Sequence, residues 1–367
     1  MKIFSFFSGS GFLDLGFEMA GFSVELVNEF SPMFMEAYKY SRAQMKMKRP
    51  IHGYHNCDIN EFLTIRANEL REKVSFSRKG GEFVGFVGGP PCPDFSVAGK
   101  QRGKSGDNGK LSQTYVDLII EQLPDFFLFE NVKGLWRTAK HRAYYEELKS
   151  KLENHYALTD RLTNAIEFGA PQDRDRIFLF GVRRDICDDL SNFPWEKHIR
   201  FDLDDIKKLE WPERTPFGYE YAIECPAGLP KELTAQYWFE KNEVDQHPNR
   251  NDHFQPRNGL AKMCTVDEGD DSRKSYKRLH RWRYSPTVCY GNNEVHLHPY
   301  KERRLTASEA MALQSLPKEF ALPPNMSLTD KFKTIGNGVP FLLAEGIART
   351  IAEFLSEVKS GDPPDCK

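Results

Sequence analysis

The sequence predicts an α/β protein with a parallel sheet in its first half and a second, smaller domain of different character. Short apolar runs alternate with segments of helical periodicity in the first half, which is the pattern of parallel strands joined by helices. From about residue 185 to 280 the periodicity weakens, and proline, charged residues and isolated aromatic residues dominate. A chain of 367 residues, 40% of them hydrophobic, is long enough for one large domain or two.

The apolar runs and the amphipathic segments locate the expected elements. The strands are expected at Ile3–Phe7, Ser23–Val27, Phe83–Val87, Phe126–Phe129 and Ile177–Val182. The helices are expected at Leu13–Ala20, Tyr115–Gln122, Tyr144–Glu153, Leu305–Leu316 and Phe341–Leu355. The tail, 359–367, is rich in proline and charge and is expected to be disordered.

Composition argues against several classes of protein. The seven cysteines are scattered, odd in number and without a CxxC pair, which disfavours a disulfide framework and a zinc site. No stretch approaches the roughly 18 apolar residues of a membrane span, and the N-terminus does not resemble a cleavable signal, so a cytoplasmic protein is expected. Basic residues gather between Arg273 and Arg304. Such a stripe can bind phosphate, or it can be a solvated surface.

Chemically active residues follow the expected strands, one group after another. They are the turn Ser8-Gly9-Ser10-Gly11, then Asn28-Glu29, Asp58, Gly88-Gly89-Pro90-Pro91-Cys92 and Glu130-Asn131. Ligands of open parallel sheets bind beyond the carboxyl ends of the strands. A purely structural sheet would not need these groups at five successive positions, so the sequence predicts a binding site along this edge.

The first turn and the following acid indicate an adenosine cofactor. Gly9 and Gly11 allow close approach of a ligand to the backbone, and Glu29 lies where an acid would bind ribose hydroxyls. The third glycine of the dinucleotide motif is missing, which favours an adenosine without pyrophosphate over a nicotinamide dinucleotide. The alternative interpretation is a simple tight turn and a surface acid.

Cys92 and Glu130 are the candidate catalytic pair. Cys92 lies within Pro-Pro-Cys-Pro, where the prolines fix the backbone and hold a thiol at a defined angle, as a nucleophile requires. Glu130 follows the apolar run FFLF, and burial there would raise its pKa and allow it to donate a proton to a ring nitrogen. The structural alternatives are an inert small cysteine and a salt-bridged glutamate.

The segment Gln172-Asp173-Arg174-Asp175-Arg176 precedes the last expected strand. Arginine at alternating positions puts Arg174 and Arg176 on one face of an extended segment. They could contact bases or phosphates, or they could pair with the intervening acids, and the spacing does not decide between these alternatives.

These residues belong to sequence blocks that together resemble the DNA (cytosine-5) methyltransferases, and in particular those of bacterial type II restriction-modification systems. The blocks, in order, are FFSGSGFLDLGFEMAGF, VNEF, CDI, GGPPCPDFSVAGK, ENV, NAIEFGAPQDRDRIF, RRLTASEAMALQSLP and IGNGVP. The resemblance covers residues 3–183 and 281–343 and is highly specific in the order and spacing of its blocks.

The resemblance implies a Rossmann-like, S-adenosylmethionine-dependent methyltransferase sheet with a smaller target-recognition domain. The expected organisation is a catalytic and cofactor-binding domain (1–184), a target-recognition region (185–280), the rest of the small domain with its connection (281–325), a segment returning to the catalytic domain (326–358) and the tail. The expected product of the cofactor is S-adenosylhomocysteine, and no metal is expected. The implied partner is duplex DNA, bound by a monomer that works beside a cognate restriction endonuclease.

The resemblance also implies the site residues. The Cys92 thiolate would add to carbon 6 of a flipped cytosine, Glu130 would hold N3 and the exocyclic amine, and Arg176 would hold O2. The implied cofactor residues are Phe7, Ser8, Gly9, Gly11, Leu13, Glu29, Phe30, Asp58, Ile59, Pro91, Leu111, Asn337 and Val339. Ser96, Lys100 and Arg174 are implied as phosphate contacts or active-site support. The further expected DNA contacts are Arg257, Arg273, Lys277, Arg278 and Arg281.

Three departures from the family pattern leave the catalytic groups intact. Pro93 stands where many relatives have glutamine, Asn108 where many have arginine, and Ser308 replaces a frequent arginine. Lys104 or Lys110 could supply the phosphate contact that Asn108 lacks. His296 and His298 could resemble a metal pair, but without a third ligand a structural or DNA-proximal role is expected instead.

Three rival functions remain open from the sequence. A tRNA cytosine-5 methyltransferase shares this fold, although the long recognition segment and PPCPDFS argue against it. A nicotinamide-dependent oxidoreductase with an active cysteine would bind NAD rather than S-adenosylmethionine. A binding module without catalysis is disfavoured by the complete set of Cys92, Glu130 and Arg176.

Overall fold

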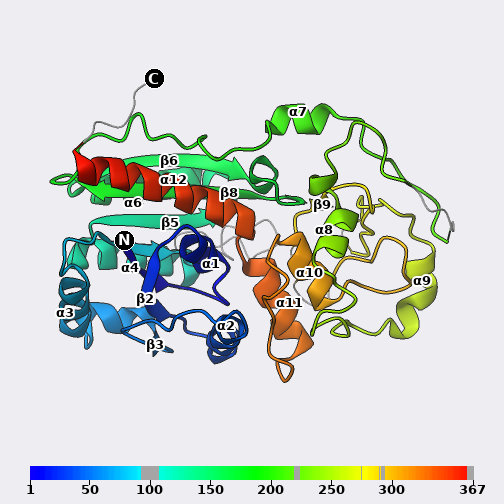
Figure 1. Ribbon diagram of the computed structural model, residues 1–367, viewed down its shortest axis with the longest axis horizontal. Coiled ribbons are helices and arrows are strands. Elements are labelled where there is room, and N and C mark those ends of the chain that lie inside the picture. The colour runs from blue at the N-terminus through cyan, green and yellow to red at the C-terminus, as the bar shows by residue number, and fades with distance from the viewer. Residues whose placement is uncertain (92–106, 219–223, 274, 289, 291–293, 362–367) are drawn as a thin grey trace.

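The computed structural model describes residues 1–91, 107–218, 224–273, 275–288, 290 and 294–361 (Figure 1). One half of the molecule is built on a seven-stranded sheet with the strand order β3-β2-β1-β4-β5-β8-β6. Its strands are β1 (Lys2–Phe6), β2 (Ser23–Asn28), β3 (Tyr54–His55), β4 (Val84–Gly88), β5 (Phe126–Val132), β6 (Tyr156–Asn164) and β8 (Asp175–Arg183). Each of the five expected strands corresponds to one of these, within a few residues at either end.

The sheet is not wholly parallel, so that part of the prediction was wrong. Strands β1 to β5 pair in parallel, but β8 runs antiparallel to both β5 and β6. The connection from β6 to β8 holds only the short helix η3 (Ala165–Phe168) and the two-residue strand β7 (Gln172–Asp173), and a connection of this length lacks the crossover helix of a parallel pair. The reversal brings the start of β8 beside the carboxyl end of β5, where Arg176 pairs with Val132.

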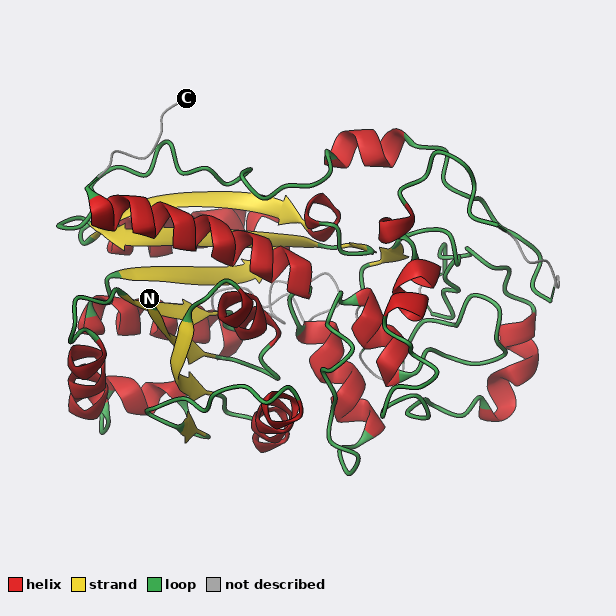
Figure 2. Ribbon diagram, viewed as in Figure 1, coloured by secondary structure: helices red, strands yellow, loops and turns green. Residues whose placement is uncertain are grey.

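Helices cover both faces of the sheet (Figure 2). One apolar core contains residues of α1 (Phe12–Met19) and α12 (Phe341–Ser360), and α2 (Pro32–Gln44) contributes to it. The other core contains residues of α3 (Ala67–Ser77), α4 (Asp107–Gln122) and α6 (Ala139–Leu152). Two short helices, η1 (Ile59–Leu63) and α5 (Gly134–Arg137), lie in connections at the sheet. Both cores contain residues of the apolar strands that the sequence predicted.

The other half of the molecule has short helices and long irregular segments (Figure 1). Its elements are α7 (Leu203–Lys208), η4 (Lys231–Leu233), α8 (Ala235–Lys241), η5 (Arg257–Gly259), α9 (Leu260–Cys264), β9 (Ser285–Pro286), α10 (Ala307–Leu313) and α11 (Leu328–Asn337). An apolar core here includes residues of α8, α10 and α11, and Phe12 and Leu15 of α1 and Ala37 of α2 contribute to it. Strand β9 pairs in parallel with β7, which ties this half to the segment before β8.

The C-terminal segment connects the two halves. The hydroxyl groups of Ser10 and Thr334 lie 2.6 Å apart, so the glycine turn after β1 is hydrogen-bonded to α11. A side chain at Gly338 would collide with the Phe12 ring, which explains the need for glycine where this segment crosses α1. Helix α12 then lies against α1, and a Cβ atom at Gly16 would come within 2.5 Å of Ala344. No helix in the described part of the chain is long and apolar enough to cross a membrane.

Candidate active site and DNA-facing cleft

A large cleft runs between the carboxyl ends of the strands and the second half of the molecule. Most of the residues predicted for the site lie along its walls. These are Phe7, Ser8, Gly9, Leu13, Glu29, Phe30, Asp58, Ile59, Pro91, Leu111, Glu130, Arg174, Arg176, Arg273, Lys277, Asn337 and Val339. Strands β1, β2, β4 and β5 deliver the groups of the first wall, because parallel strands end at one edge of the sheet.

The turn after β1 is fixed by the acid at the end of β2. The backbone N–H of Gly9 donates to Glu29 Oε2 over 2.8 Å, and that of Ser31 donates to Glu29 Oε1 over 2.7 Å. Phe7 has a φ of 54° and Gly9 a φ of 55°, so this turn is held in the left-handed region. Burial raises the pKa of Glu29, against the lowering effect of these N–H donors. Each carboxylate oxygen still has a lone pair that can accept from a ligand hydroxyl.

Gly11 has a different role from the one expected. It is not among the residues that line the cleft. Its φ is 82°, and a Cβ atom there would collide with the Tyr38 ring. Its carbonyl oxygen accepts a hydrogen bond from Arg42 Nη2 over 2.7 Å. Glycine is therefore required at this position for packing of the turn against α2.

A pocket of apolar side chains continues the first wall. Phe30 is 71% exposed and lies at the cleft, although it is a large aromatic residue. Ile59 also lines the cleft and is buried. The residue before it, Asp58, caps η1, because its carboxylate accepts from the Asn60 N–H over 2.8 Å. An exposed ring, a buried aliphatic side chain and a nearby acid are suited to a flat heteroaromatic ligand with polar edges.

Glu130 and Arg176 form the central ion pair of the cleft. Glu130 Oε1 lies 2.7 Å from Arg176 Nε, with the two side chains 12% and 8% exposed. A Cβ atom at Gly89 would come within 2.5 Å of Glu130 Oε2, so glycine makes room for the carboxylate. Burial raises the pKa of Glu130, and the charge of Arg176 opposes this rise. Cys92 follows the cleft-lining Pro91 in the chain but lies outside the described residues.

Arg174 is held between the two halves of the molecule. Its side chain is buried at 1% exposure; Nη1 donates to the Val288 carbonyl over 2.8 Å, and Nη2 donates to the Gly336 carbonyl over 2.6 Å. The guanidinium group therefore joins the segment before β8 to the other half of the molecule, at Val288 and at the end of α11. This argues against the expected contact with DNA phosphate, because its donors are bound to backbone carbonyls.

The acids of the Gln172–Arg176 segment do not neutralise the neighbouring arginines. Asn164 Nδ2 donates to Asp173 over 2.6 Å and to Asp175 over 2.8 Å. Lys133 lies 2.9 Å from Asp175, and Lys207 lies 3.6 Å from Asp173. The ion pair of Arg176 is therefore with Glu130, while the intervening acids bind Asn164, Lys133 and Lys207.

The expected DNA contacts divide into three groups. Arg273 and Lys277 line the cleft. Arg278 is 0% exposed and donates to backbone carbonyls, while Arg281 Nη2 lies 2.8 Å from Glu268, so both arginines serve the scaffold instead. The last group lies outside the described residues and comprises Ser96, Lys100, the side chain of Arg257 and, among the departures, Pro93, Lys104 and the side chain of Asn108.

The cleft is also lined by three lysines that the sequence analysis did not predict. They are Lys133, Lys207 and Lys333. Lys133 follows Glu130-Asn131 at the end of β5, so the rule that strand ends carry function could have found it. Lys207 lies on α7 and Lys333 on α11, and neither is marked by a motif in the sequence.

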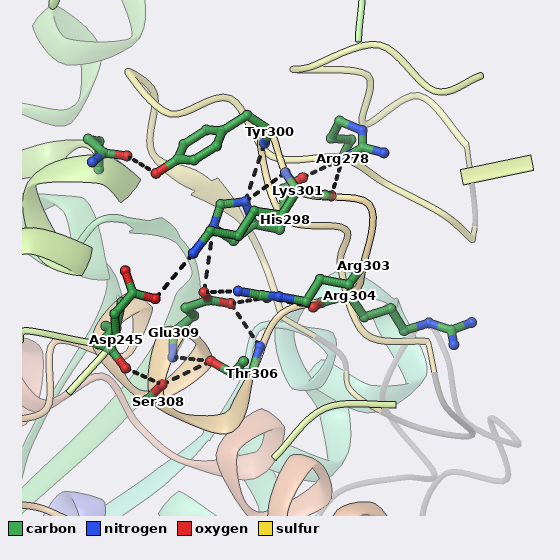
Figure 3. A network of polar contacts seen from close by, with 12 residues as sticks. Asp245, Arg278, His298, Tyr300, Lys301, Arg303, Arg304, Thr306, Ser308 and Glu309 are labelled. Atoms are coloured by element: carbon green, nitrogen blue, oxygen red, sulfur yellow. Dashed lines mark hydrogen bonds and ion pairs between the residues drawn. The ribbon is translucent and has the colours of Figure 1, made fainter. Parts of the chain in front are cut away.

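The two histidines singled out from the sequence have different surroundings. Among the described residues, no group of three or more His, Cys, Asp or Glu side chains could hold a metal ion. His298 belongs instead to a polar network with Glu309 and the backbone of Tyr300 and Lys301 (Figure 3). His296 lies on the wall of the cleft.

The fold and the cleft define an α/β enzyme with a nucleoside-type cofactor site beside a second site bearing a buried acid. The chain matches the family described as C-5 cytosine-specific DNA methylase over residues 1–353, and it belongs to this family. It is 57% identical over 355 residues to the type II methyltransferase M.NmeDI of Neisseria meningitidis serogroup C, covering 96% of this chain and 84% of the relative. The predicted family, fold class and enzyme class are confirmed.

Solved structures agree on the fold. A prophage-encoded E. coli protein superimposes with a TM-score of 0.66 at 21% identity, covering 97% of this chain and 100% of that chain. The S. pombe Dnmt2 methyltransferase gives a TM-score of 0.60 at 13% identity, covering 98% of this chain and 99% of that chain. The protein is therefore a cytosine-5 DNA methyltransferase of the type II restriction-modification kind, for which the family implies S-adenosylmethionine as cofactor and DNA as substrate.

Proposed function

We propose that the chain methylates a flipped cytosine in a specific duplex sequence through a covalent bond to Cys92. The observation that carries this proposal is the buried Glu130–Arg176 pair, which lies beside the backbone that leads into Cys92. A carboxyl with a raised pKa and a guanidinium fit the two polar edges of a cytosine ring, N3 with its exocyclic amine and O2.

The first wall of the cleft fits S-adenosylmethionine. Glu29, fixed by two N–H donors, would accept from the ribose hydroxyls, and the exposed Phe30 ring would stack on the adenine. Gly9 leaves open space for the methionine part, since a Cβ atom there would meet no atom within 4 Å. When bound, the cofactor supplies an electrophilic methyl group and leaves as S-adenosylhomocysteine.

The chain's own groups would carry the remaining steps. The Cys92 thiolate forms a bond to carbon 6, and the displaced electron pair makes carbon 5 nucleophilic as N3 takes a proton from Glu130. Arg176 holds O2 and fixes the ring. After carbon 5 has gained the methyl group, its proton passes to solvent water; N3 then returns its proton to the Glu130 carboxylate as the carbon 6–sulfur bond breaks, which restores the ring and the thiolate.

The burial of Glu130 supports a mechanism in which the target cytosine leaves the duplex. The Glu130 side chain lines the cleft and is only 12% exposed. A cytosine stacked in the duplex would keep its N3 atom paired with guanine and could not reach this carboxyl group. A flipped base would bury its polar edge against Glu130 and Arg176. We assign residues 1–184 to this chemistry and residues 185–280 to sequence recognition, with the segment 281–358 joining the two functions.

The chain would act as a monomer on DNA that a cognate restriction endonuclease also recognises. The experiment is methyl transfer from labelled S-adenosylmethionine to duplex DNA and to tRNA, followed by bisulfite sequencing of DNA from a host that expresses the chain. Label in duplex DNA at one sequence is expected, with none above background for Cys92→Ala. Label in tRNA alone would overturn the proposal.

The covalent step has a separate test. Duplex DNA with 5-fluorocytosine at the target position cannot lose a proton from carbon 5, so the Cys92 adduct should accumulate. A complex that resists denaturation is expected with the unmodified enzyme and not with Cys92→Ala. Methylation without such a complex would contradict the covalent route while leaving the substrate assignment intact.

A further inference from the structure

His296 and His298 lie two residues apart but have opposite environments. Both ring nitrogens of His298 have partners: Nδ1 accepts from the Lys301 N–H over 3.1 Å and from the Tyr300 N–H over 3.3 Å, and Nε2 lies 3.4 Å from Glu309 Oε1 (Figure 3). The Phe239 ring stacks on the imidazole. His298 is thus a fully bonded part of the scaffold.

His296 is nearly as buried but lacks such partners. Its exposure is 6%, and its Nδ1 atom is buried with no hydrogen-bond partner in the part of the chain that the structure describes. The ring meets Tyr290 edge-on at 5.5 Å, and the His296 carbonyl accepts from the Leu305 N–H over 2.9 Å. Buried polar atoms in proteins are nearly always hydrogen-bonded, so an unpaired nitrogen at a well-packed position needs an explanation.

The location of His296 supplies that explanation. It lines the cleft on the recognition side, close in sequence to Glu294 and Val295 on the same wall. That wall also includes Val288, whose carbonyl oxygen binds Arg174, and Arg174 is adjacent in the chain to the Asp175-Arg176 segment of the active site. His296 therefore lines the same cleft as the Glu130–Arg176 pair, on the wall opposite the sheet.

We propose that His296 reads the edge of a base in the target sequence through its imidazole nitrogens. The proposal rests on the proposed function, because it needs duplex DNA in the cleft. Burial and the charge of Lys277 lower the pKa of His296 to about 3, so the ring is neutral and offers one donor and one acceptor. Base edges present such pairs of groups, whereas a phosphate selects a cation. Nδ1 is shielded from the cleft in this arrangement, so a turn of the ring about its Cβ–Cγ bond would be needed to present this nitrogen to a base.

The test compares His296→Leu with the unmodified enzyme on the cognate duplex and on duplexes that each carry one substituted base pair. The expected result is a fall in kcat/KM on the cognate site of roughly ten- to a hundredfold, with lost discrimination at one base pair and unchanged discrimination at the others. The salt dependence of DNA binding should not change, because no phosphate contact is removed.

Lys277→Gln is the matched control, since Lys277 lines the same wall as a cation. It should weaken binding at all sequences alike and lower the salt slope by about one. Unchanged discrimination in His296→Leu would overturn the proposal, and so would a uniform loss with a lower salt slope, which marks a phosphate contact. If both variants still methylate DNA while His296→Leu keeps its discrimination, the base-reading proposal fails but the proposed function stands. If the unmodified enzyme does not methylate DNA, the proposed function itself fails.

Folding has its own control. Thermal unfolding of His296→Leu should match that of the unmodified enzyme, because the substitution removes an unpaired polar atom. If His296→Leu does not fold, the test uses His296→Gln instead, because glutamine keeps a hydrogen-bond donor and an acceptor. A changed preference at one base pair in His296→Gln would then support base reading, and an unchanged preference would overturn it.

Discussion

In the half that contains the seven-stranded sheet (the sheet half), the backbone groups of strands β1, β4 and β5 hydrogen-bond to one another. In the half that contains α7 to α11, which we propose recognises the target sequence (the recognition half), side chains bind many of the backbone carbonyls. Arg278 alone donates to the carbonyls of Val266, Met263, His298 and Lys301. A neutral ladder can be built from almost any apolar sequence, but a scaffold of this second kind depends on individual polar residues. A basic residue in the recognition half is therefore not by itself a DNA contact.

The largest expected effect in the sheet half comes from Glu130→Gln. Loss of the proton donor to N3 should lower kcat by about a hundredfold or more. Glu130 must be protonated to donate, and burial raises its pKa, so the rate should fall as the pH rises through that raised pKa. Because an amide donates at every pH, this alkaline decline should disappear in Glu130→Gln. A pH–rate profile that keeps the decline would assign it to another group.

The largest expected effect in the recognition half is on stability. Arg278→Met would leave four carbonyl acceptors without their donor, and it should lower the free energy of unfolding by about 3–5 kcal/mol in urea. The control is Arg214→Met, because Arg214 is 54% exposed in its ion pair with Asp270 and should contribute less than about 1 kcal/mol. Unchanged stability with weaker DNA binding would make Arg278 a DNA contact, as the sequence indicated.

Two glycines of one turn should separate packing from cofactor binding. Gly11→Ala collides with Tyr38 at a positive φ and should destabilise the fold by about 2–4 kcal/mol. Gly9→Ala has open space on the cleft side and should cost about 1–2 kcal/mol from backbone strain, while its methyl group blocks the cofactor. Calorimetry with S-adenosylhomocysteine and thermal unfolding measure both properties. Weak binding by a fully stable Gly11→Ala would reverse the two assignments.

The smallest expected effect concerns the lysines on the cleft rim. Lys133→Gln and Lys207→Gln should each lower the salt slope of DNA binding by about one and leave kcat unchanged. Lys318→Gln, which alters an exposed ion pair with Glu243, is the control that should change neither. A slope equal to that of the control would place these lysines outside the DNA path.

The sheet and its strand-end residues could be predicted because apolar periodicity is local. FFLF and the residues that follow it predict β5 and Glu130 without knowledge of any neighbour. The antiparallel β8 could not be predicted in this way, because strand direction depends on the length of the connection and on pairing with distant β6. The sequence also predicted that Arg174 and Arg176 share one face, but which carbonyls Arg174 would meet depends on two segments more than 100 residues away.

The recognition half resists prediction for a related reason. Arg278 and Lys277 are adjacent and chemically alike, yet one is buried in the scaffold and the other lines the cleft. The difference arises from where the carbonyls of residues 263–301 converge, which no short sequence pattern encodes. His296 and His298 show the same limit of prediction. They lie two residues apart, but only His298 has partners for both of its ring nitrogens.

The Arg174 bridge gives the enzyme a thermodynamic property. One guanidinium group binds both Val288, on the wall that we propose to face DNA, and Gly336, beside Asn337 of the proposed cofactor site. A ligand that fixed either carbonyl would also restrain the other through this guanidinium group, and such a restraint would couple the binding of the two ligands. Binding linkage is reciprocal, so DNA must tighten the cofactor by the same factor that the cofactor tightens DNA.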